Sequence, residues 1–168
     1  IAFLGCIGDG FLPEFASEFG KQYPEMWADV KTAFSGLYST EIGKIGKMLS
    51  FGLKDTTTNV VKMLKFLCEI KSPIEILEEN KKTHSIHQRF KQINNKYQAL
   101  IEKARAMASG KLLYFQYGGD LSLSADIANE LYYLYPDKVI VVAYISGAKA
   151  NVSLRGLNVK EITTKAIQ

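Results

Sequence analysis

Residues Lys138–Gly156, KVIVVAYISGAKANVSLRG, give the clearest structural signal in the sequence. The first part of this stretch, Val139–Ile145, is an uninterrupted apolar run rich in valine and isoleucine, which is typical of a strand buried on both faces. Ser146 and Gly147 form a turn sequence, and Ala150–Leu154 predicts a second extended segment after it. The stretch therefore predicts a hairpin whose first strand lies in the interior of a sheet.

Two polar side chains stand at the end of this hairpin, Ser153 and Arg155. A hydroxyl group donates and accepts hydrogen bonds, and a guanidinium group presents a planar set of N–H donors that matches a phosphate or a carboxylate. The pair is therefore a candidate anion-binding site, and the rest of the hairpin is its support.

The residues around the hairpin predict an α/β domain. Leu112–Tyr117 predicts a strand before the hairpin. Between the two lies a helix with Ile127, Leu131 and Leu134 on one face, and a last helix begins after Asn158. A strand–helix–strand connection of this kind favours parallel pairing of its two strands.

The composition permits a packed core and a polyanionic partner. The chain has 168 residues, of which 47% are hydrophobic, and a formal charge of +4. Cys6 and Cys68 lie far apart in apolar contexts, which predicts buried free thiols rather than a disulfide or zinc site. No apolar run approaches the ~20 residues of a membrane-spanning helix, and no signal peptide is visible. We therefore expect a cytoplasmic protein without a membrane partner.

The first residues predict a second candidate site. Ile1–Ile7 is a short apolar segment bounded by glycines, which indicates a buried strand, and Asp9 follows it between Gly8 and Gly10. Ligands of α/β proteins gather outside the carboxyl ends of strands, so the Asp9 carboxylate is a candidate ligand. The alternative is a turn aspartate that bonds its own backbone.

The segment Glu14–Glu79 predicts several short helices. One opens at Pro24 and contains Trp27 and Val30, and the last opens with the capping box of Ser72–Glu75. Two further helices are predicted between them. The buried face of the first consists of Ile42, Ile45, Met48 and Leu49. The buried face of the second consists of Val60, Val61, Leu64, Leu67 and Cys68.

Lys81–Ala108 predicts one long helix with an apolar heptad-like stripe and an excess of positive charge. Seven basic residues against the single acid Glu102 give +6, in a chain whose total is +4. The excess favours contact with a polyanion, and a solvated face is the alternative. His84 and His87 are interpreted as solvated, because no third metal ligand is near. The stripe is Ile86, Phe90, Ile93, Tyr97, Leu100, Ala104 and Met107; the basic residues are Lys81, Lys82, Arg89, Lys91, Lys96, Lys103 and Arg105.

The order of these features resembles the DHH phosphoesterase family, and within it the RecJ-like single-strand exonucleases of archaeal type. Ile1–Pro13, IAFLGCIGDGFLP, resembles the fourth catalytic motif of that family, in which the aspartate corresponding to Asp9 is a metal ligand. Leu123–Leu131, within LSLSADIANEL, and Val152–Gly156, VSLRG, resemble its C-terminal substrate-binding domain.

The resemblance implies three regions and a divalent-metal mechanism. Residues 1–80 would be the end of an α/β catalytic domain, 81–109 a connector helix, and 110–168 a truncated substrate-binding domain. Two metal ions, manganese in particular, would activate water and compensate phosphoryl charge, with Asp9 as one ligand and the others upstream of this chain. Ser153 and Arg155 would hold single-stranded nucleic acid, and Lys81, Lys82, Arg89, Lys91 and Lys96 would contact its backbone.

The chain lacks other motifs of that family. The Asp-His-His motif and the glycine-rich motif that ends in histidine are absent, and the chain begins at Ile1 without a methionine. We interpret it as the C-terminal piece of an enzyme and expect the piece alone to be inactive. The alternatives are a phosphodiesterase for oligonucleotides or cyclic dinucleotides, and a non-catalytic relative in a replication or repair complex.

Overall fold

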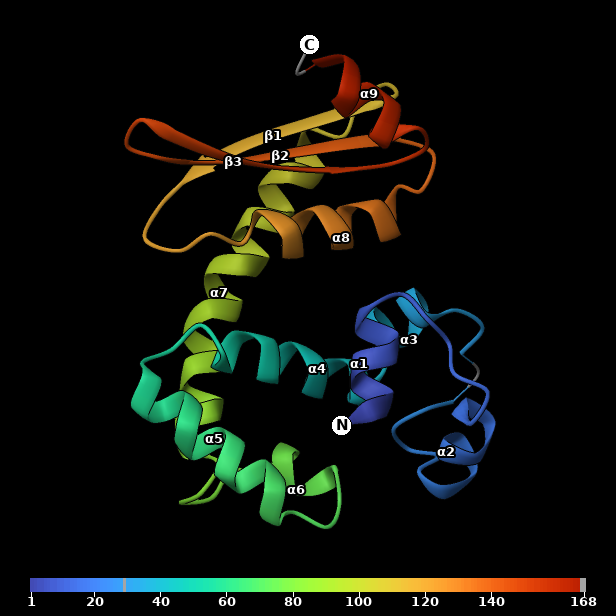
Figure 1. The fold of residues 1–168 in the computed structure, drawn as a ribbon, viewed down its shortest axis with the longest axis vertical. Helices are drawn as coiled ribbons and strands as arrows, with labels where there is room; N and C mark the ends of the chain where they lie inside the picture. Colours follow the sequence, from blue (N-terminus) through green and yellow to red (C-terminus); the bar gives the residue numbers. More distant parts are fainter. Residues whose placement is uncertain (29, 167–168) are drawn as a thin grey trace. The chain divides into compact units, whose positions relative to one another are not determined.

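The computed structural model describes residues 1–28 and 30–166. The chain combines helices with one three-stranded sheet and divides into two compact units, Ile1–Asn94 and Asn95–Gln168 (Figure 1). The dividing point lies inside helix α7 (His84–Ala106), so each unit contains about half of that helix. None of the helices in the described part of the chain is long and apolar enough to cross a bilayer.

In the N-terminal unit, the described residues form helices and turns. Its core consists of apolar side chains from α1 to α6 and the first half of α7, together with Met26 and Trp27 between α2 and α3. The helices before α7 are α1 (Ala2–Gly8), α2 (Ala16–Gln22), α3 (Ala33–Ser39), α4 (Glu41–Gly52), α5 (Thr57–Glu69) and α6 (Ile74–Leu77).

The strand predicted at Ile1–Ile7 is wrong, because these residues form helix α1. Phe3 and Ile7, four residues apart, are both buried, which is the spacing of one helix face. The Phe3 ring stacks on Phe19 of α2 with ring centroids 4.2 Å apart. A short apolar run fits a buried strand and a buried helix equally well by periodicity, and here the tertiary partners selected the helix.

The helix predicted to open at Pro24 is also wrong. Pro24 lies in a turn, and the next helix, α3, starts after Thr32. The Thr32 side chain accepts a hydrogen bond from the Ser35 backbone N–H at 3.1 Å and completes a capping box there. Trp27 packs so closely on α3 that a Cβ added at Gly36 would lie 2.3 Å from its ring.

Helix α4 has the predicted buried face, whereas α5 does not. Ile42, Ile45 and Met48 are buried in α4. In α5 the buried side chains are Met63 and Phe66. The predicted stripe is wrong because the contacts of Met63 and Phe66 with the core decide which face is covered. Of the predicted residues, Val60 and Leu67 are half-buried, and Val61, Leu64 and Cys68 are exposed.

The cysteine prediction is therefore wrong for burial, although both thiols are free. Cys68 is exposed on α5, and Cys6 on α1 is half-buried.

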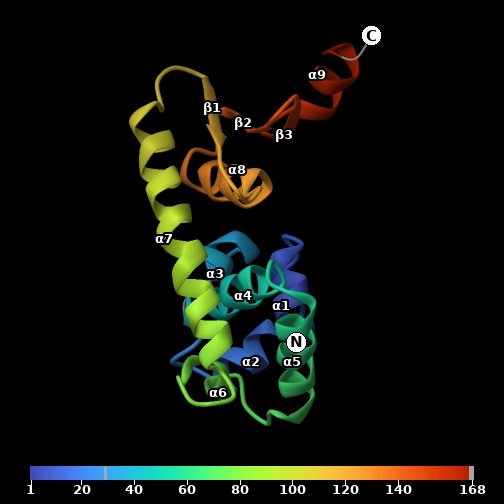
Figure 2. The same ribbon diagram turned by 90° about the vertical axis from the view of Figure 1, so that its left-hand side faces the viewer.

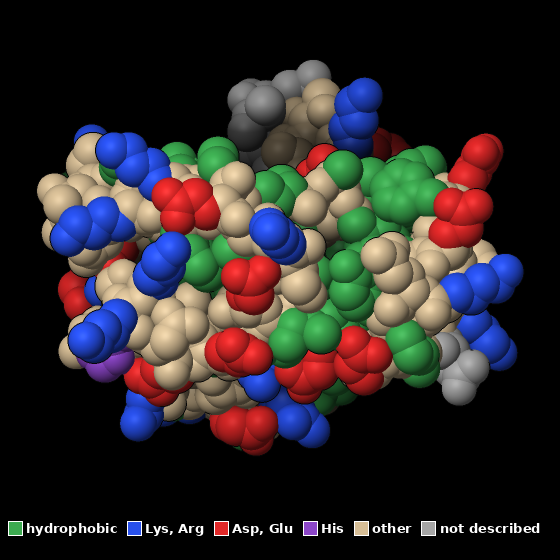
Figure 3. Space-filling model, turned by 90° about the horizontal axis from the view of Figure 1, so that it is seen from below, with side chains coloured by type: hydrophobic (Ala, Val, Ile, Leu, Met, Phe, Trp, Pro, Cys, Tyr) green, Lys and Arg blue, Asp and Glu red, His purple; other side chains and the backbone are tan. Residues whose placement is uncertain are grey.

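Figure 3 shows one face of the molecule on which basic and acidic side chains are interspersed, with hydrophobic side chains exposed between them.

The capping box of Ser72–Glu75 is confirmed in part: the Glu75 bond to the Ser72 N–H is present, but the Ser72 hydroxyl does not bond the Glu75 N–H, and Pro73 is the N-cap residue of α6. One carboxylate oxygen of Glu75 accepts the backbone N–H groups of Lys71 at 2.9 Å and Ser72 at 3.0 Å. The Ser72 hydroxyl accepts the Ile74 N–H at 3.3 Å. The bonds from the Lys71 and Ser72 N–H groups favour the ionised carboxylate and lower the pKa of Glu75.

The apolar stripe of α7 is confirmed for most of its length. Ile86, Ile93 and Tyr97 are buried, as is Ala104. Met107, predicted in the stripe, lies just beyond the helix and is 53% exposed. The stripe therefore ends where the helix ends.

The C-terminal unit has the predicted strand–helix–strand–strand order (Figure 2). Strand β1 (Leu112–Gly118) pairs parallel with β2 (Val139–Ser146), and β2 pairs antiparallel with β3 (Lys149–Arg155), so both predicted pairings are confirmed. Helix α8 (Ser124–Leu134) lies along one face of the sheet, and α9 (Val159–Ala166) lies on the side away from it.

The strand β2 is the centre of this sheet, as its apolar run predicted. Ile140, Val142 and Tyr144 are buried on the face toward α8. On the other face Ala143 is buried, while Val141 is half-buried. The prediction that β2 is buried on both faces is therefore confirmed in part. The apolar residues on the face toward α8 are buried, whereas the opposite face is only partly buried.

Candidate functional site

Arg155 lies at the end of β3 and is held by two hydrogen bonds. It stands opposite the buried Ile140 of β2, which places it on the α8 face of the sheet. Its Nε donates to Oδ1 of Asn129 on α8 at 2.6 Å, and its Nη1 donates to the Leu154 carbonyl at 2.7 Å. The side chain is half-buried, so the guanidinium group is fixed but still reaches the surface.

Ser153 lies on the same face of β3, two residues before Arg155. It stands opposite Val142 of β2. Its hydroxyl is 3.1 Å from the hydroxyl of Ser124, the first residue of α8, and Ser124 is buried. Residues i and i+2 of a strand point to the same face, about 7 Å apart along it. The two predicted residues are therefore brought together, each with a partner on α8.

The arrangement suits an anion. Arg155 has five N–H donors, and two of them make the bonds just described. The other three have no partner among the described residues. The hydrogens of the Ser153 and Ser124 hydroxyls can rotate, so Ser124 can donate to Ser153 while Ser153 donates outward. Guanidinium and hydroxyl donors on one face can bind two oxygens of a single phosphate group.

Asp9 lies away from other metal-ligating side chains. It is the exposed C-cap residue of α1, and its backbone N–H donates to the Gly5 carbonyl at 3.0 Å. No cluster of three or more histidine, cysteine or acidic side chains occurs in residues 1–28 and 30–166 that could hold a metal ion. One carboxylate does not satisfy two divalent ions, so the described residues do not fit a two-metal site.

Three of the five basic residues predicted to contact a polyanion are already bonded within the protein. Lys82 pairs with Glu69 at 3.2 Å, and Lys96 pairs with Asp120 at 2.8 Å. Arg89 donates through Nε and Nη2 to the carbonyl oxygen of Lys54, just after α4. The arginine therefore fastens the turn that follows α4.

Lys81 and Lys91 are the two that remain. Both side chains are exposed, and neither has an ion pair or a hydrogen bond among the described residues. They lie at the surface of the N-terminal unit and could attract a polyanion, but as separate charges rather than as part of a built site.

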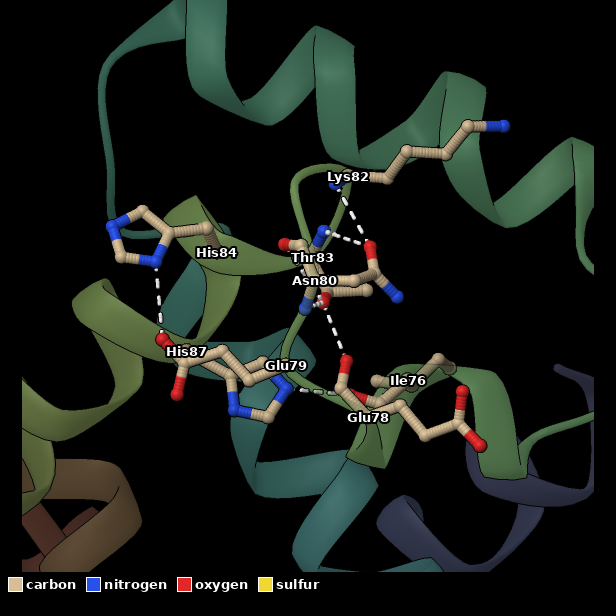
Figure 4. Close-up of polar contacts among 8 residues, drawn as sticks. All are labelled: Ile76, Glu78, Glu79, Asn80, Lys82, Thr83, His84 and His87. Carbon is tan, nitrogen blue, oxygen red and sulfur yellow. Dashed lines mark hydrogen bonds and ion pairs between the residues drawn. The ribbon is translucent and has the colours of Figure 1, made fainter.

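The two histidines at the start of α7 belong to a structural junction (Figure 4). Nδ1 of His84 is 3.0 Å from a Glu79 carboxylate oxygen, and Nε2 of His87 donates to the Ile76 carbonyl at 2.8 Å. His84 is exposed, but His87 is half-buried, so the interpretation of two solvated histidines is wrong for His87. Its bond fixes α6 against α7.

The buried Thr83 completes this junction. Its hydroxyl donates to the Glu78 carbonyl at 2.5 Å and accepts the Asn80 N–H at 2.9 Å, while the Asn80 side chain accepts the Lys82 N–H at 2.9 Å (Figure 4). These bonds satisfy backbone groups just before α7. The cluster is therefore explained by helix initiation and needs no ligand.

Two residues of the site were missed by sequence reasoning. Ser124 makes no side-chain cap bond at the start of α8, and its hydroxyl bonds Ser153. Asn129 was not considered at all. The signal that could have indicated it is an asparagine inside a helix, where this residue is unfavourable unless its side chain has a partner.

No family model, curated protein or solved structure matches the chain.

Proposed function

We propose that the chain is the C-terminal part of a RecJ-like, DHH-type phosphoesterase or exonuclease, and that its C-terminal unit holds single-stranded nucleic acid through a backbone phosphate. One observation carries the proposal: Ser153 and Arg155 lie on one face of β3, each held by α8, with guanidinium N–H groups left for a ligand. Their positions in VSLRG are those that the family resemblance assigns to substrate binding.

The roles of the protein's own groups follow from their chemistry. The Arg155 guanidinium neutralises phosphate charge and donates hydrogen bonds to its oxygens, and Ser153 adds one hydroxyl. These contacts bind and orient the strand, and they do not break a bond. In the resembled family, divalent ions such as manganese supply the attacking hydroxide and stabilise phosphoryl charge. By the same resemblance, Asp9 would be one ligand of that site.

The fold organisation fits the same proposal. The strand–helix–strand–strand unit of residues 110–168 would be the substrate-binding domain, α7 the connector, and the helices before it the end of the catalytic domain. The two free cysteines suit a reducing cytoplasm. The N-terminal unit has helices where a strand was expected, so its assignment rests on Asp9 and its flanking sequence alone.

A binding titration tests the substrate role. Fluorescence anisotropy of a labelled single-stranded oligonucleotide should show that Arg155→Ala weakens binding about tenfold, because charge-assisted hydrogen bonds to phosphate are lost. Lys91→Ala, which removes one exposed charge, should weaken it less than about threefold at the same salt concentration. Equal losses in the two variants would refute a specific role for Arg155.

An activity assay addresses the chemistry. The 168-residue chain should not degrade the oligonucleotide with added manganese, because Asp9 lacks co-ligands among the described residues. Manganese-dependent turnover that is lost in Asp9→Asn would contradict this expectation. Binding of cyclic dinucleotides in preference to oligonucleotides would instead favour the small-substrate alternative, and binding of neither would favour a non-catalytic role.

A further inference from the structure

Asn129 occupies an unusual position for its residue type. It lies in the interior of α8, where asparagine lowers helix stability because its side chain competes for backbone bonds. Here its Oδ1 instead accepts a hydrogen bond from Arg155 Nε at 2.6 Å, across the space between helix and sheet. The Asn129 side chain is half-buried, so this bond is only partly exposed to competition from water.

The bond restricts how the guanidinium group can turn. A guanidinium group is planar and donates five hydrogen bonds in fixed directions. Arg155 is fixed at Nε by Asn129 and at Nη1 by the Leu154 carbonyl. Two bonds at different nitrogens fix the plane, so the remaining N–H groups, two of them on Nη2, keep a constant direction.

The serine pair is restrained in a similar way. Ser124 is buried at the start of α8, and its hydroxyl is bonded to that of Ser153. Asn129 lies five residues further along the same helix, and its partner Arg155 lies two residues further along the same strand. One helix therefore holds both donors of the strand at two separate points.

We infer that Asn129 is a positioning residue, which orients the Arg155 guanidinium so that it and the Ser153 hydroxyl bind the same phosphate group of a single-stranded nucleic acid. The inference rests on the proposed function and deepens it. Without Asn129 the arginine keeps its charge but samples several orientations. Binding must then fix one of them, and the loss of side-chain conformational entropy weakens the complex.

A double-mutant cycle tests this role with the 168-residue chain and a labelled single-stranded oligonucleotide. Asn129→Ala should weaken binding about fivefold when Arg155 is present, the size expected for loss of one hydrogen bond and its ordering. In the Arg155→Ala background the same substitution should have no further effect, because the group that it positions is gone.

Asn59→Ala is the matched control. Asn59 is also half-buried on a helix and donates through its side chain, to Asp55 at 3.1 Å, but it lies in the N-terminal unit. Its substitution should leave oligonucleotide binding unchanged. Circular dichroism of each variant at the assay temperature establishes that the comparison is made between folded proteins.

The outcomes separate the inference from the proposed function. If Arg155→Ala leaves binding unchanged, the proposed function and this inference both fail. If Arg155→Ala weakens binding but Asn129→Ala does not, the function stands and the positioning role is wrong. If Asn129→Ala weakens binding equally with and without Arg155, its role is to maintain α8 and the inference is again refuted.

Discussion

The two units use their polar side chains differently. In Ile1–Asn94 several polar side chains bond backbone groups at or next to the ends of helices, among them Thr32, Thr40, Glu75 and Arg89. In the C-terminal unit, polar side chains bond one another between α8 and β3, and the arginine among them keeps free donors. In the first pattern the side-chain donors and acceptors are bonded to the backbone and stabilise the fold. In the second, N–H donors of Arg155 remain for a ligand. The arginine donors without a partner therefore lie in the C-terminal unit.

The largest effect is expected from a substitution that separates two helices of the N-terminal unit. A Cβ added at Gly43 would lie 2.2 Å from the Leu37 carbonyl oxygen, so Gly43→Ala must push α3 and α4 apart. We expect a loss of about 3 kcal/mol in the free energy of unfolding. Fluorescence of Trp27, the one tryptophan of the sequence, during urea denaturation measures it in this unit.

Gly46→Ala on the same helix is the control for Gly43→Ala. The nearest atom to its added Cβ would be a Leu4 methyl group at 3.4 Å, an ordinary contact. Because alanine favours a helix over glycine by about 0.5–1 kcal/mol, this variant should be unchanged or more stable. Equal destabilisation by both substitutions would show that close backbone approach is not what holds the N-terminal unit together.

A middle-sized effect is expected from a polar bond between elements of the C-terminal unit. The hydroxyl of the buried Tyr117 accepts the Leu123 N–H at 2.5 Å, and Tyr117→Phe leaves that N–H without its partner. The loss should be about 1–2 kcal/mol in denaturant unfolding followed by circular dichroism. Tyr114→Phe, on an exposed ring whose hydroxyl bonds Gln116, should change stability by less than about 0.5 kcal/mol.

Tyr117 also gives a pH dependence with a definite sign. Burial raises the pKa of its phenol, so the folded state holds this proton more tightly than the unfolded state. Its contribution is fully present below the unfolded pKa of about 10 and is lost as pH rises through the folded pKa. Stability should therefore fall more steeply at alkaline pH in the natural protein than in Tyr117→Phe; equal slopes would contradict the role of burial.

The smallest effect is expected at Glu75, whose carboxylate caps the exposed start of α6. Glu75→Gln should lower stability slightly, because an amide oxygen accepts the Lys71 and Ser72 N–H groups more weakly. Since the pKa of Glu75 is lowered, its contribution is present above the unfolded pKa of about 4.3 and is lost as pH falls through the folded pKa. The difference in melting temperature between pH 7 and pH 3 should therefore be smaller in Glu75→Gln than in the natural protein. An unchanged difference would show that other carboxylates cause the pH dependence.

The sequence predicted the C-terminal unit better than the N-terminal one for a physical reason. In that unit, strands and their connecting helix are separated by clear turn sequences. The apolar run Val139–Ile145 lies between two such turns, which favours a strand over a helix. In the N-terminal unit, Ile1–Ile7 was too short for its period to distinguish strand from helix. The stripe of α5 contains enough apolar residues for two faces, and contacts distant in sequence chose between them.

The sequence alone was enough to predict the hairpin, its parallel partner strand, the long helix α7 and the Glu75 bond to Ser72, because these depend on local periodicity and local hydrogen bonds. It also indicated Ser153 and Arg155 as a candidate pair for binding an anion. The bonds of Asn129 and Ser124 to that pair, and those of Lys82, Lys96 and Arg89 within the protein, are seen only in the folded chain. Such contacts join residues far apart in the chain, and no local pattern encodes which donor meets which acceptor.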